Sequence, residues 1–220
     1  MSRFILLLVL LTGSTYAQDP NLESAFVSAN IGGFITAHDG FEDTYNSKFG
    51  FAPGVSLGLP LSPHLYLYGK ATYFAKTGVP LITTYSIDTA GNVTVISQRK
   101  DGTAKFREWI FNAGLLYDII LSQKYKLGIS AGATITSLYE HDEYHGITSE
   151  LSSSTLTGVG LLGYFCGLSL ERNFGDGPFS AFAEVQYNYS RPIISSFIGN
   201  YGGTNLTLGV RWYFKDRRRK

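Results

Sequence analysis

Cysteine, charge and long apolar runs are all scarce in this chain, and each shortage excludes a class of protein. Cys166 is the single cysteine among 220 residues, so no internal disulfide and no cysteine-ligated metal site can form. Charged residues make up only 16%, and without Arg3 of the leader the chain has 17 basic and 17 acidic residues. That balance indicates no nucleic-acid partner. After residue 17, no continuous apolar run is long enough for a membrane-spanning helix.

The N-terminus has the pattern of an export signal. Arg3 gives a short positive region, residues 4–11 are all apolar, and Thr15 and Ala17 are small residues at the two positions that a signal peptidase reads. The apolar run is too short for a membrane anchor. We therefore predict a signal peptide over residues 1–17, a main domain over 18–214 and a basic tail over 215–220.

Aromatic residues and glycine are plentiful, which favours sheet over helix. Aromatics make up 15% of the chain, nearly all Tyr and Phe, and there are 25 glycines. Residues 125–137 alternate most cleanly between apolar and small or polar side chains, the pattern of a strand with two different faces.

Eight stretches share this two-residue period: 25–35, 48–59, 65–75, 106–119, 125–137, 156–171, 179–190 and 204–214. Three short connections (60–64, 120–124 and 173–178) alternate with four long ones, which begin near His38, Lys76, Leu138 and Arg191. Bacterial outer-membrane barrels show this asymmetry, with short periplasmic turns and longer outside loops. Because lipid cannot satisfy backbone polar groups, the sheet has to close on itself. We predict an all-β fold, an eight-stranded antiparallel up-and-down transmembrane β-barrel in the bacterial outer membrane.

The outward-facing aromatic rings sort into two levels, as a membrane barrel in contact with outer-membrane lipid requires. The rings predicted near the turn end are Tyr117, Tyr125, Phe179, Trp212 and Phe214. Those predicted near the loop end are Phe49, Phe51, Tyr73, Trp109, Tyr187 and Tyr189. Between the two levels no outward position carries Lys, Arg, Asp or Glu. A cation there would cost roughly 2–4 kcal/mol at the bilayer midplane.

The leader, the alternating strands and the ending V-R-W-Y-F at residues 210–214 resemble the OmpA/OmpX-type outer-membrane β-barrel superfamily, in style closest to the barrel-domain family common in Bacteroidetes. The resemblance covers nearly all of the chain after the leader. It implies that the barrel assembly machinery reads the last aromatic of the final strand, here Phe214. This chain departs from the pattern by continuing into the basic tail, which is predicted to lie in the periplasm.

The interior of an eight-stranded barrel is filled by its own side chains. The predicted inward positions include the charged residues Lys70, Glu108, Lys126, Glu184 and Arg211. Since charges in such a place should pair, our hypothesis is that Glu108 and Glu184 meet Lys70 and Arg211 in a polar network that plugs the lumen. The alternative is general acid/base catalysis by the two glutamates. The sequence shows no nucleophile signature, so we expect no enzyme.

Residues 141–145 (H-D-E-Y-H) contain side chains of metal-ligand type. They fall in a predicted outer loop without a second ligand cluster, so a solvated loop is the favoured interpretation. No metal and no cofactor is predicted.

The sequence favours a structural or interaction role through the extracellular loops. The contact element predicted is the segment 76–105, a hairpin with the apolar residues Val79, Leu81, Ile82, Tyr85 and Ile96. A narrow channel and a lipid-modifying enzyme are the alternatives. The identity of the partner, conduction and the oligomeric state stay open.

Overall fold

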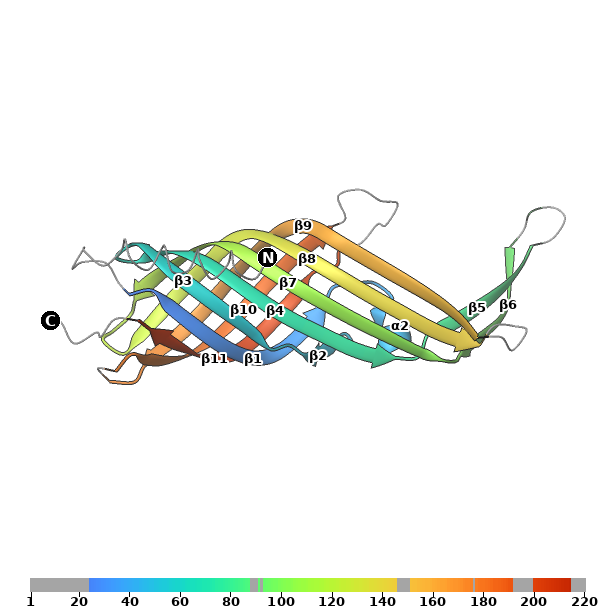
Figure 1. Ribbon diagram of the computed structural model, residues 1–220, viewed down its shortest axis with the longest axis horizontal. Coiled ribbons are helices and arrows are strands. Elements are labelled where there is room, and N and C mark those ends of the chain that lie inside the picture. The colour runs from blue at the N-terminus through green and yellow to red at the C-terminus, as the bar shows by residue number, and fades with distance from the viewer. Residues whose placement is uncertain are drawn as a thin grey trace, which may run out of the picture.

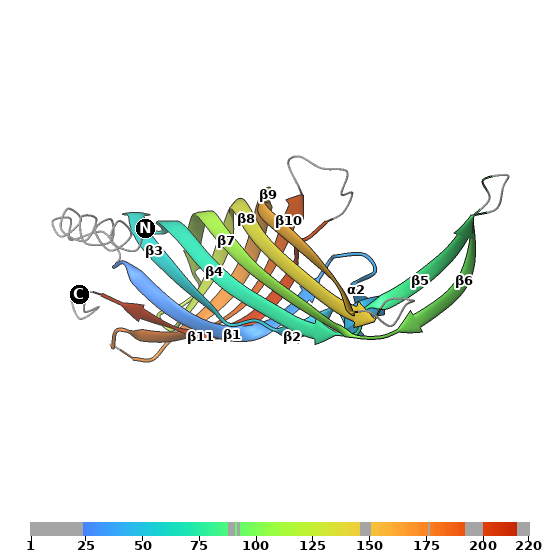
Figure 2. The same ribbon diagram turned by 45° about the vertical axis from the view of Figure 1, so that its right-hand side comes forward.

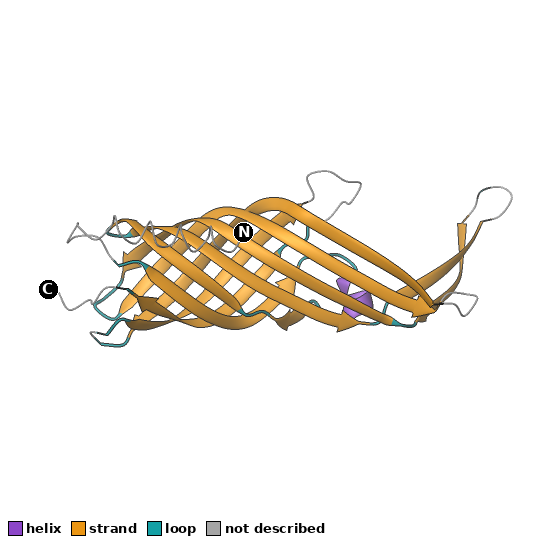
Figure 3. Cartoon of the chain, in the orientation of Figure 1, coloured by secondary structure: helices purple, strands orange, loops and turns teal. Residues whose placement is uncertain are grey.

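The computed structural model describes residues 24–87, 91, 93–145, 151–175, 177–191 and 200–214. Within them lie eleven strands and one short helix (Figure 1; Figure 3). In chain order these are β1 (Phe26–Thr36), α2 (Phe41–Tyr45), β2 (Phe49–Phe51), β3 (Gly54–Ser62), β4 (Leu65–Gly78), β5 (Leu81–Ile87), β6 (Val93–Lys100), β7 (Thr103–Ile120), β8 (Tyr125–His145), β9 (Leu151–Asn173), β10 (Phe179–Arg191) and β11 (Gly203–Tyr213). No helix in these ranges has the length and apolar character needed to cross a membrane.

Eight strands close into a ring. Their order is β11-β10-β9-β8-β7-β4-β3-β1, and β1 pairs back with β11 from Phe26↔Tyr213 to Thr36↔Gly203. All the pairings are antiparallel, so closure leaves the ring without an open edge in the hydrocarbon. The start of β1 and the end of β11 lie at the end where short turns join β3 to β4, β7 to β8 and β9 to β10. The predicted fold class is confirmed.

The two faces of the wall have opposite character. The side chains of Ile129, Leu208 and Val210 are 43%, 65% and 49% exposed, whereas Ser130 and Arg211 are 3% and 1% exposed. Apolar groups therefore face outward and polar groups face the lumen, the reverse of a soluble protein. A hydrocarbon environment explains this arrangement.

The exposed apolar residues of the outer wall, such as Ile129, Leu208 and Val210, form a band that we call the apolar belt. Several strands continue beyond this belt at the loop end. β8 and β9 stay paired up to His145↔Leu151, and β5 and β6 form a separate two-stranded sheet that projects past the barrel (Figure 2). The predicted polar loop that begins at Leu138 is therefore largely strand. Above the belt no lipid selects apolar side chains, so the alternation in the sequence is lost while the backbone pairing continues.

The predicted strand over residues 48–59 is interrupted. Ala52 and Pro53 separate the three-residue strand β2 from β3, and both strands pair with β1. The backbone N–H of Ala52 donates to Gly32 (2.9 Å), and the carbonyl of Pro53 accepts from the N–H of Tyr73 (3.0 Å), so the break is itself hydrogen-bonded to the wall. α2 lies in a predicted loop. Five residues are too few for a helix that is stable alone, so its packing inside the barrel mouth must hold it.

Candidate functional site: the lumen and the extracellular hairpin

An ion pair crosses the middle of the lumen. Lys70 on β4 pairs with Glu184 on β10, two strands that are not neighbours in the ring. Lys70 Nζ also donates to Gln186 Oε1 (3.1 Å), Tyr68 donates its hydroxyl to Glu184 Oε2 (3.2 Å), and Gln186 Nε2 donates to Asn188 Oδ1 (3.1 Å). Both charges are buried, so this pairing offsets a large desolvation cost.

A second buried ion pair lies nearer the turn end. Arg211 Nη1 donates to Glu171 Oε2 at 2.5 Å, and the Tyr213 hydroxyl donates to Glu171 Oε1 at 2.6 Å. The Arg211 guanidinium carbon lies 4.7 Å from the ring centroid of Phe26 and 4.6 Å from that of Phe182. Arg211 is thus fixed by one carboxylate and two aromatic faces.

The sequence assigned Arg211 the wrong partner. The hypothesis joined it to the network of Glu108 and Glu184, whereas the structure pairs it with Glu171. Glu171 ends the stretch 156–171, in which both faces carry apolar residues, and so its inward position did not stand out.

The predicted partner of Glu108 is also wrong. Its carboxyl group is completely buried, and neither oxygen lies within hydrogen-bonding distance of a donor in the described part of the chain. Its cross-strand neighbours, Phe74 on β4 and Leu138 on β8, are both buried and apolar. The predicted contact of Glu108 with Lys70 or Arg211 is therefore absent, because Glu108 lies in the apolar part of the lumen.

That apolar part closes the loop end of the barrel. Its members are Phe34, Phe41, Tyr45, Ala52, Phe74, Ala104, Phe106, Ile110, Leu138, Leu161 and Tyr201, which we call the loop-end cluster. Phe41 and Tyr45 bring α2 into it, with the ring of Phe41 4.3 Å from that of Tyr45 and 5.0 Å from that of Phe106. The Tyr45 hydroxyl donates to Glu140 Oε1 (2.7 Å). Burial, and then the bond to Glu140, raise the pKa of Tyr45, so this phenol stays a neutral donor.

A smaller aromatic cluster fills the turn end. It consists of Phe26, Tyr66, Tyr68, Leu116, Phe165 and Tyr213. The ring of Phe26 lies 5.5 Å from that of Tyr66 and 5.6 Å from that of Tyr213. Beside this cluster Lys126 Nζ pairs with Asp118 Oδ2 at 3.5 Å. Ring clusters thus occupy both ends of the lumen, the contacts of Lys70 and Glu184 occupy its middle, and two further ion pairs lie toward the turn end.

All eleven residues assigned to the two levels of aromatic rings, here called the aromatic girdles, lie on the outer wall: Phe49, Phe51, Tyr73, Trp109, Tyr117, Tyr125, Phe179, Tyr187, Tyr189, Trp212 and Phe214. The ring of Tyr73 is tilted against that of Trp109, with centroids 4.8 Å apart, and the ring of Trp212 lies 5.5 Å from that of Phe214. Rings with a polar tip settle at the headgroup level of a bilayer, so these positions suit anchoring at both interfaces.

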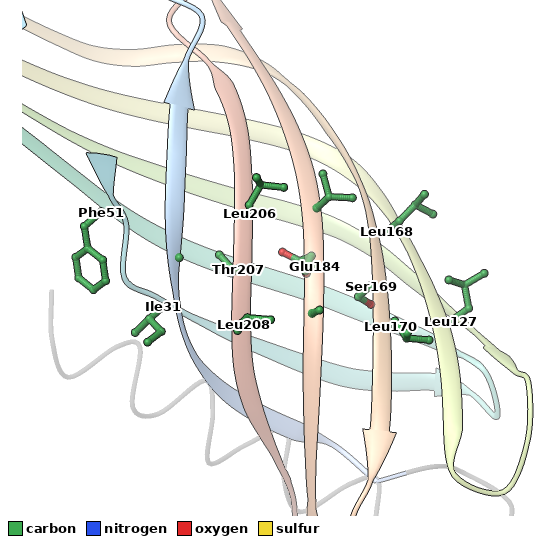
Figure 4. Close-up of a pocket in the computed structure, with 13 residues that line it drawn as sticks. Ile31, Phe51, Leu127, Leu168, Ser169, Leu170, Glu184, Leu206, Thr207 and Leu208 are labelled. Atoms are coloured by element: carbon green, nitrogen blue, oxygen red, sulfur yellow. The ribbon is translucent and has the colours of Figure 1, made fainter. Parts of the chain in front are cut away.

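The outer wall has a shallow hollow of about 770 Å³ (Figure 4). Leu168, Val185, Leu206 and Leu208 line it, together with the small residue Ala183. The exposed side chains there are aliphatic apart from the ring of Phe51, so the hollow is suited to a hydrocarbon chain and not to a polar substrate.

The hairpin of β5 and β6 is fixed to the barrel at its base. The N–H of Val79 donates to the carbonyl of Thr44 (2.9 Å), and Lys100 Nζ donates to Asn46 Oδ1 (3.2 Å). Farther out, Val93 and Val95 are 63% and 51% exposed. Apolar groups this far beyond the belt lie outside the hydrocarbon.

The histidine segment lies on β8 and not in a loop. His141 Nδ1 hydrogen-bonds with Thr155 Oγ1 (2.8 Å), and its Nε2 with Glu143 Oε1 (3.1 Å). The described residues include no group of three or more His, Cys, Asp or Glu side chains placed to hold a metal ion. Neighbouring side chains thus occupy both ring nitrogens of His141.

Comparison with known proteins identifies the fold and nothing narrower. No protein-family model matches the sequence, and no curated protein is significantly similar to it. Neisserial surface protein A is 16% identical, with 88% of this chain and 99% of that chain covered and a TM-score of 0.54. The N-terminal β-barrel domain of Pseudomonas aeruginosa OprF (15%, TM-score 0.41) and Ail of Yersinia pestis (12%, TM-score 0.45) also match, each over 88% of this chain and 99% of the other.

The structure and the first of these likenesses agree. The ring of eight antiparallel strands, the exposed apolar belt and the polar lumen are the features of a barrel built for lipid. The chain has the fold of an eight-stranded outer-membrane β-barrel, the fold of Neisserial surface protein A.

Proposed function

We propose that this protein is a small outer-membrane barrel with a structural or interaction role, and that it contacts a partner through the β5–β6 hairpin. The observation that carries the proposal is the pair of exposed valines, Val93 and Val95, on an element held outside the membrane. Exposed apolar groups in water are typical of an interaction surface.

The strand edges of the hairpin support the same role. β5 pairs with β6 from Leu81↔Lys100 to Ile87↔Val93, and neither strand pairs with the barrel in the described ranges. Their outer edges can therefore accept a strand of a partner, which would add backbone hydrogen bonds to the apolar contact.

Because side chains fill the lumen, we propose that the barrel does not conduct ions. A permeating ion would have to pass the loop-end cluster, the pair formed by Lys70 and Glu184, and the turn-end rings. A planar-bilayer recording of the purified barrel should show no stable conductance. A reproducible single-channel current would favour a narrow channel.

We further propose that the protein is not an enzyme. Glu184 already pairs with Lys70, and Glu108 lies within the loop-end cluster, so the two carboxyl groups are not arranged as an acid and a base on one substrate. Incubation with lipid A should leave the mass of the lipid unchanged. A change in mass that requires the folded barrel would favour a lipid-modifying enzyme.

The hairpin is tested by removing it. Replacing residues 81–100 with a short turn should leave a folded barrel, judged by its heat-dependent gel mobility, and should abolish cross-linking to its partner in native outer membranes. The double variant Val93→Asp/Val95→Asp should do the same with the backbone intact. Thr94→Asp, on the same strand, is the matched control and should retain the cross-link, and retention by the deletion variant would refute the proposal.

Biogenesis is a separate part of the proposal. We assign Phe214 as the signal for the barrel assembly machinery, because it is the last outward aromatic residue, and its N–H donates to the carbonyl of Ala25 at the seam (3.0 Å). The predicted signal peptide (1–17) and basic tail (215–220) lie outside the described residues.

A further inference from the structure

The outward face of β7 changes character at one position. Along this face Trp109, Phe111 and Leu115 belong to the apolar belt, whereas the next outward positions toward the loop end are Arg107 and Lys105. Two residues along a strand cover ~6.8 Å, so Arg107 lies one step above the Trp109 ring and Lys105 one step farther. Both side chains are exposed. Two cations therefore stand directly above the aromatic girdle, at the level of the lipid headgroups.

These two residues, which we call the β7 cation pair, have no anionic partner in the described part of the chain. Among the described residues, no acid lies within the 4.0 Å of a salt bridge to Lys105 or Arg107. On the neighbouring strand, Glu140 turns inward to Tyr45, and Glu143 is bound by His141. The positive charge of the pair is therefore available to an external anion.

The surroundings of the pair form a shallow platform. On β4 the cross-strand neighbours are the small residues Ala75 and Thr77. On β8 they are Tyr139 and His141, and the guanidinium carbon of Arg107 lies 6.0 Å from the centroid of the Tyr139 ring. The small residues leave room on one side, and the aromatic ring steadies Arg107 on the other.

From this arrangement we propose that the β7 cation pair binds the phosphate group of an outer-leaflet lipid. A guanidinium matches a phosphate with two parallel hydrogen bonds, and an ammonium adds a point charge. The lipid chains would then run down the wall past Trp109 and Phe111, whose rings lie 6.0 Å apart and stacked. The proposal rests on the membrane location and is independent of the partner of the hairpin.

Another outward arginine, Arg191, lies at the loop-end girdle, but its surroundings differ from those of the β7 cation pair. Arg191, the last residue of β10, lies 5.2 Å from the ring centroid of Tyr189, and two positions farther along the sequence is Ile193 and not a second cation. The β7 pair is thus distinguished by two consecutive outward cations, which is why it, and not Arg191, is assigned to a phosphate.

Native mass spectrometry of the purified barrel can test the site with two probes: lipid A carrying its phosphates, and the same lipid after removal of its phosphates. The variant Lys105→Gln/Arg107→Gln should bind phosphorylated lipid A about thirty-fold more weakly, from about 1 kcal/mol per basic residue near the membrane surface. Arg99→Gln/Lys100→Gln removes the same charge from the hairpin and should bind like the unaltered barrel. Both changed pairs are exposed, and Arg107→Ala alone provides a milder variant with a smaller loss.

Three results would overturn the proposal. Equal weakening by the two double variants would show a general charge effect. Equal binding of the lipid without phosphates would remove the phosphate from the interaction. Displacement of the lipid by equimolar inorganic phosphate would indicate a site for free phosphate instead of a lipid.

Discussion

Arg211 on β11 and Glu171 on β9 form an ion pair across an intervening strand, β10, with 2.5 Å between Nη1 and Oε2. Their side chains reach past Ser180, which is the register partner of Arg211 and whose small side chain leaves space for the contact. The pair therefore ties together three strands next to the seam between β11 and β1.

Breaking this pair should destabilise the barrel strongly. Arg211→Met leaves the Glu171 carboxylate buried without its cation and should lower the free energy of unfolding by about 3–5 kcal/mol. The double variant Arg211→Met/Glu171→Leu removes both charges and should recover most of that loss. Urea unfolding in lipid vesicles, followed by tryptophan fluorescence, measures both. Equal destabilisation by the single and double variants would show that the loss does not come from the buried carboxylate of Glu171.

Removal of the Glu108 carboxyl group should instead stabilise the barrel. This carboxyl group has no hydrogen-bond donor in the described residues and lies among apolar groups, so Glu108→Leu should raise the free energy of unfolding by about 1–3 kcal/mol. Lys70→Met is the matched comparison, because it leaves Glu184 without its cation and should destabilise. The same urea titration measures whether each variant raises or lowers the free energy of unfolding. A large loss of stability in Glu108→Leu would mean that the carboxyl group has a stabilising partner.

The contrast between these two glutamates shows what the sequence could predict. Alternation placed both residues in the lumen correctly, because the lipid outside imposes a strict two-residue period. It could not rank their partners, because a pairing across the lumen depends on strand tilt and register. Lys70 and Glu184 meet although β4 and β10 are not neighbours.

The elements outside the apolar belt were harder to predict from the sequence, because no lipid selects their side chains. α2 has only five residues and depends on ring contacts of Phe41 and Tyr45, which no local signal encodes. The upper half of β8, including His141, resembled a loop because water permits polar side chains on both of its faces. The periodicity thus identified strands only where a lipid solvent selected their side chains.

The packing of His38 should weaken at acidic pH. Its ring lies 4.7 Å from that of Tyr201 and 6.2 Å from that of Phe41, outside the spanning segments. Burial, with a smaller effect of Lys48, lowers the pKa of His38 below its ordinary value of 6.5, although Asp39 acts in the opposite direction. As the pH falls below that value, the unpacked form takes up a proton first, so the packed form loses stability until the lower pKa is passed.

Hydrogen exchange measures this effect in the backbone of α2. After correction for the intrinsic rate, the amides of Asp43 and Asn46, which bond to Gly40 and Glu42, should be less protected at about pH 5.5 than at about pH 7.5. His38→Gln stays neutral and should show no such difference. An identical loss of protection in that variant would assign the pH dependence to another group.

Phe214 should affect assembly more than stability. Phe214→Ala is expected to reduce the amount of barrel inserted in cells, while the purified variant, folded in detergent, should unfold at nearly the same urea concentration. Phe179→Ala is the control, since Phe179 is also an outward ring near the turn end but not the last one. A similar reduction in cells from both variants would assign the effect to the girdle and not to a signal.

The central claim is that lipid surrounds the outer wall, and Cys166 gives direct access to it. This cysteine is exposed on β9 between the outward residues Tyr164 and Leu168. A spin label on Cys166 in vesicles should collide often with oxygen, which concentrates in hydrocarbon, and rarely with a water-soluble nickel chelate. Val95→Cys in a Cys166→Ser background should show the reverse. If the chelate reaches the label on Cys166 as readily as the one on the hairpin, the wall faces water and the membrane account is wrong.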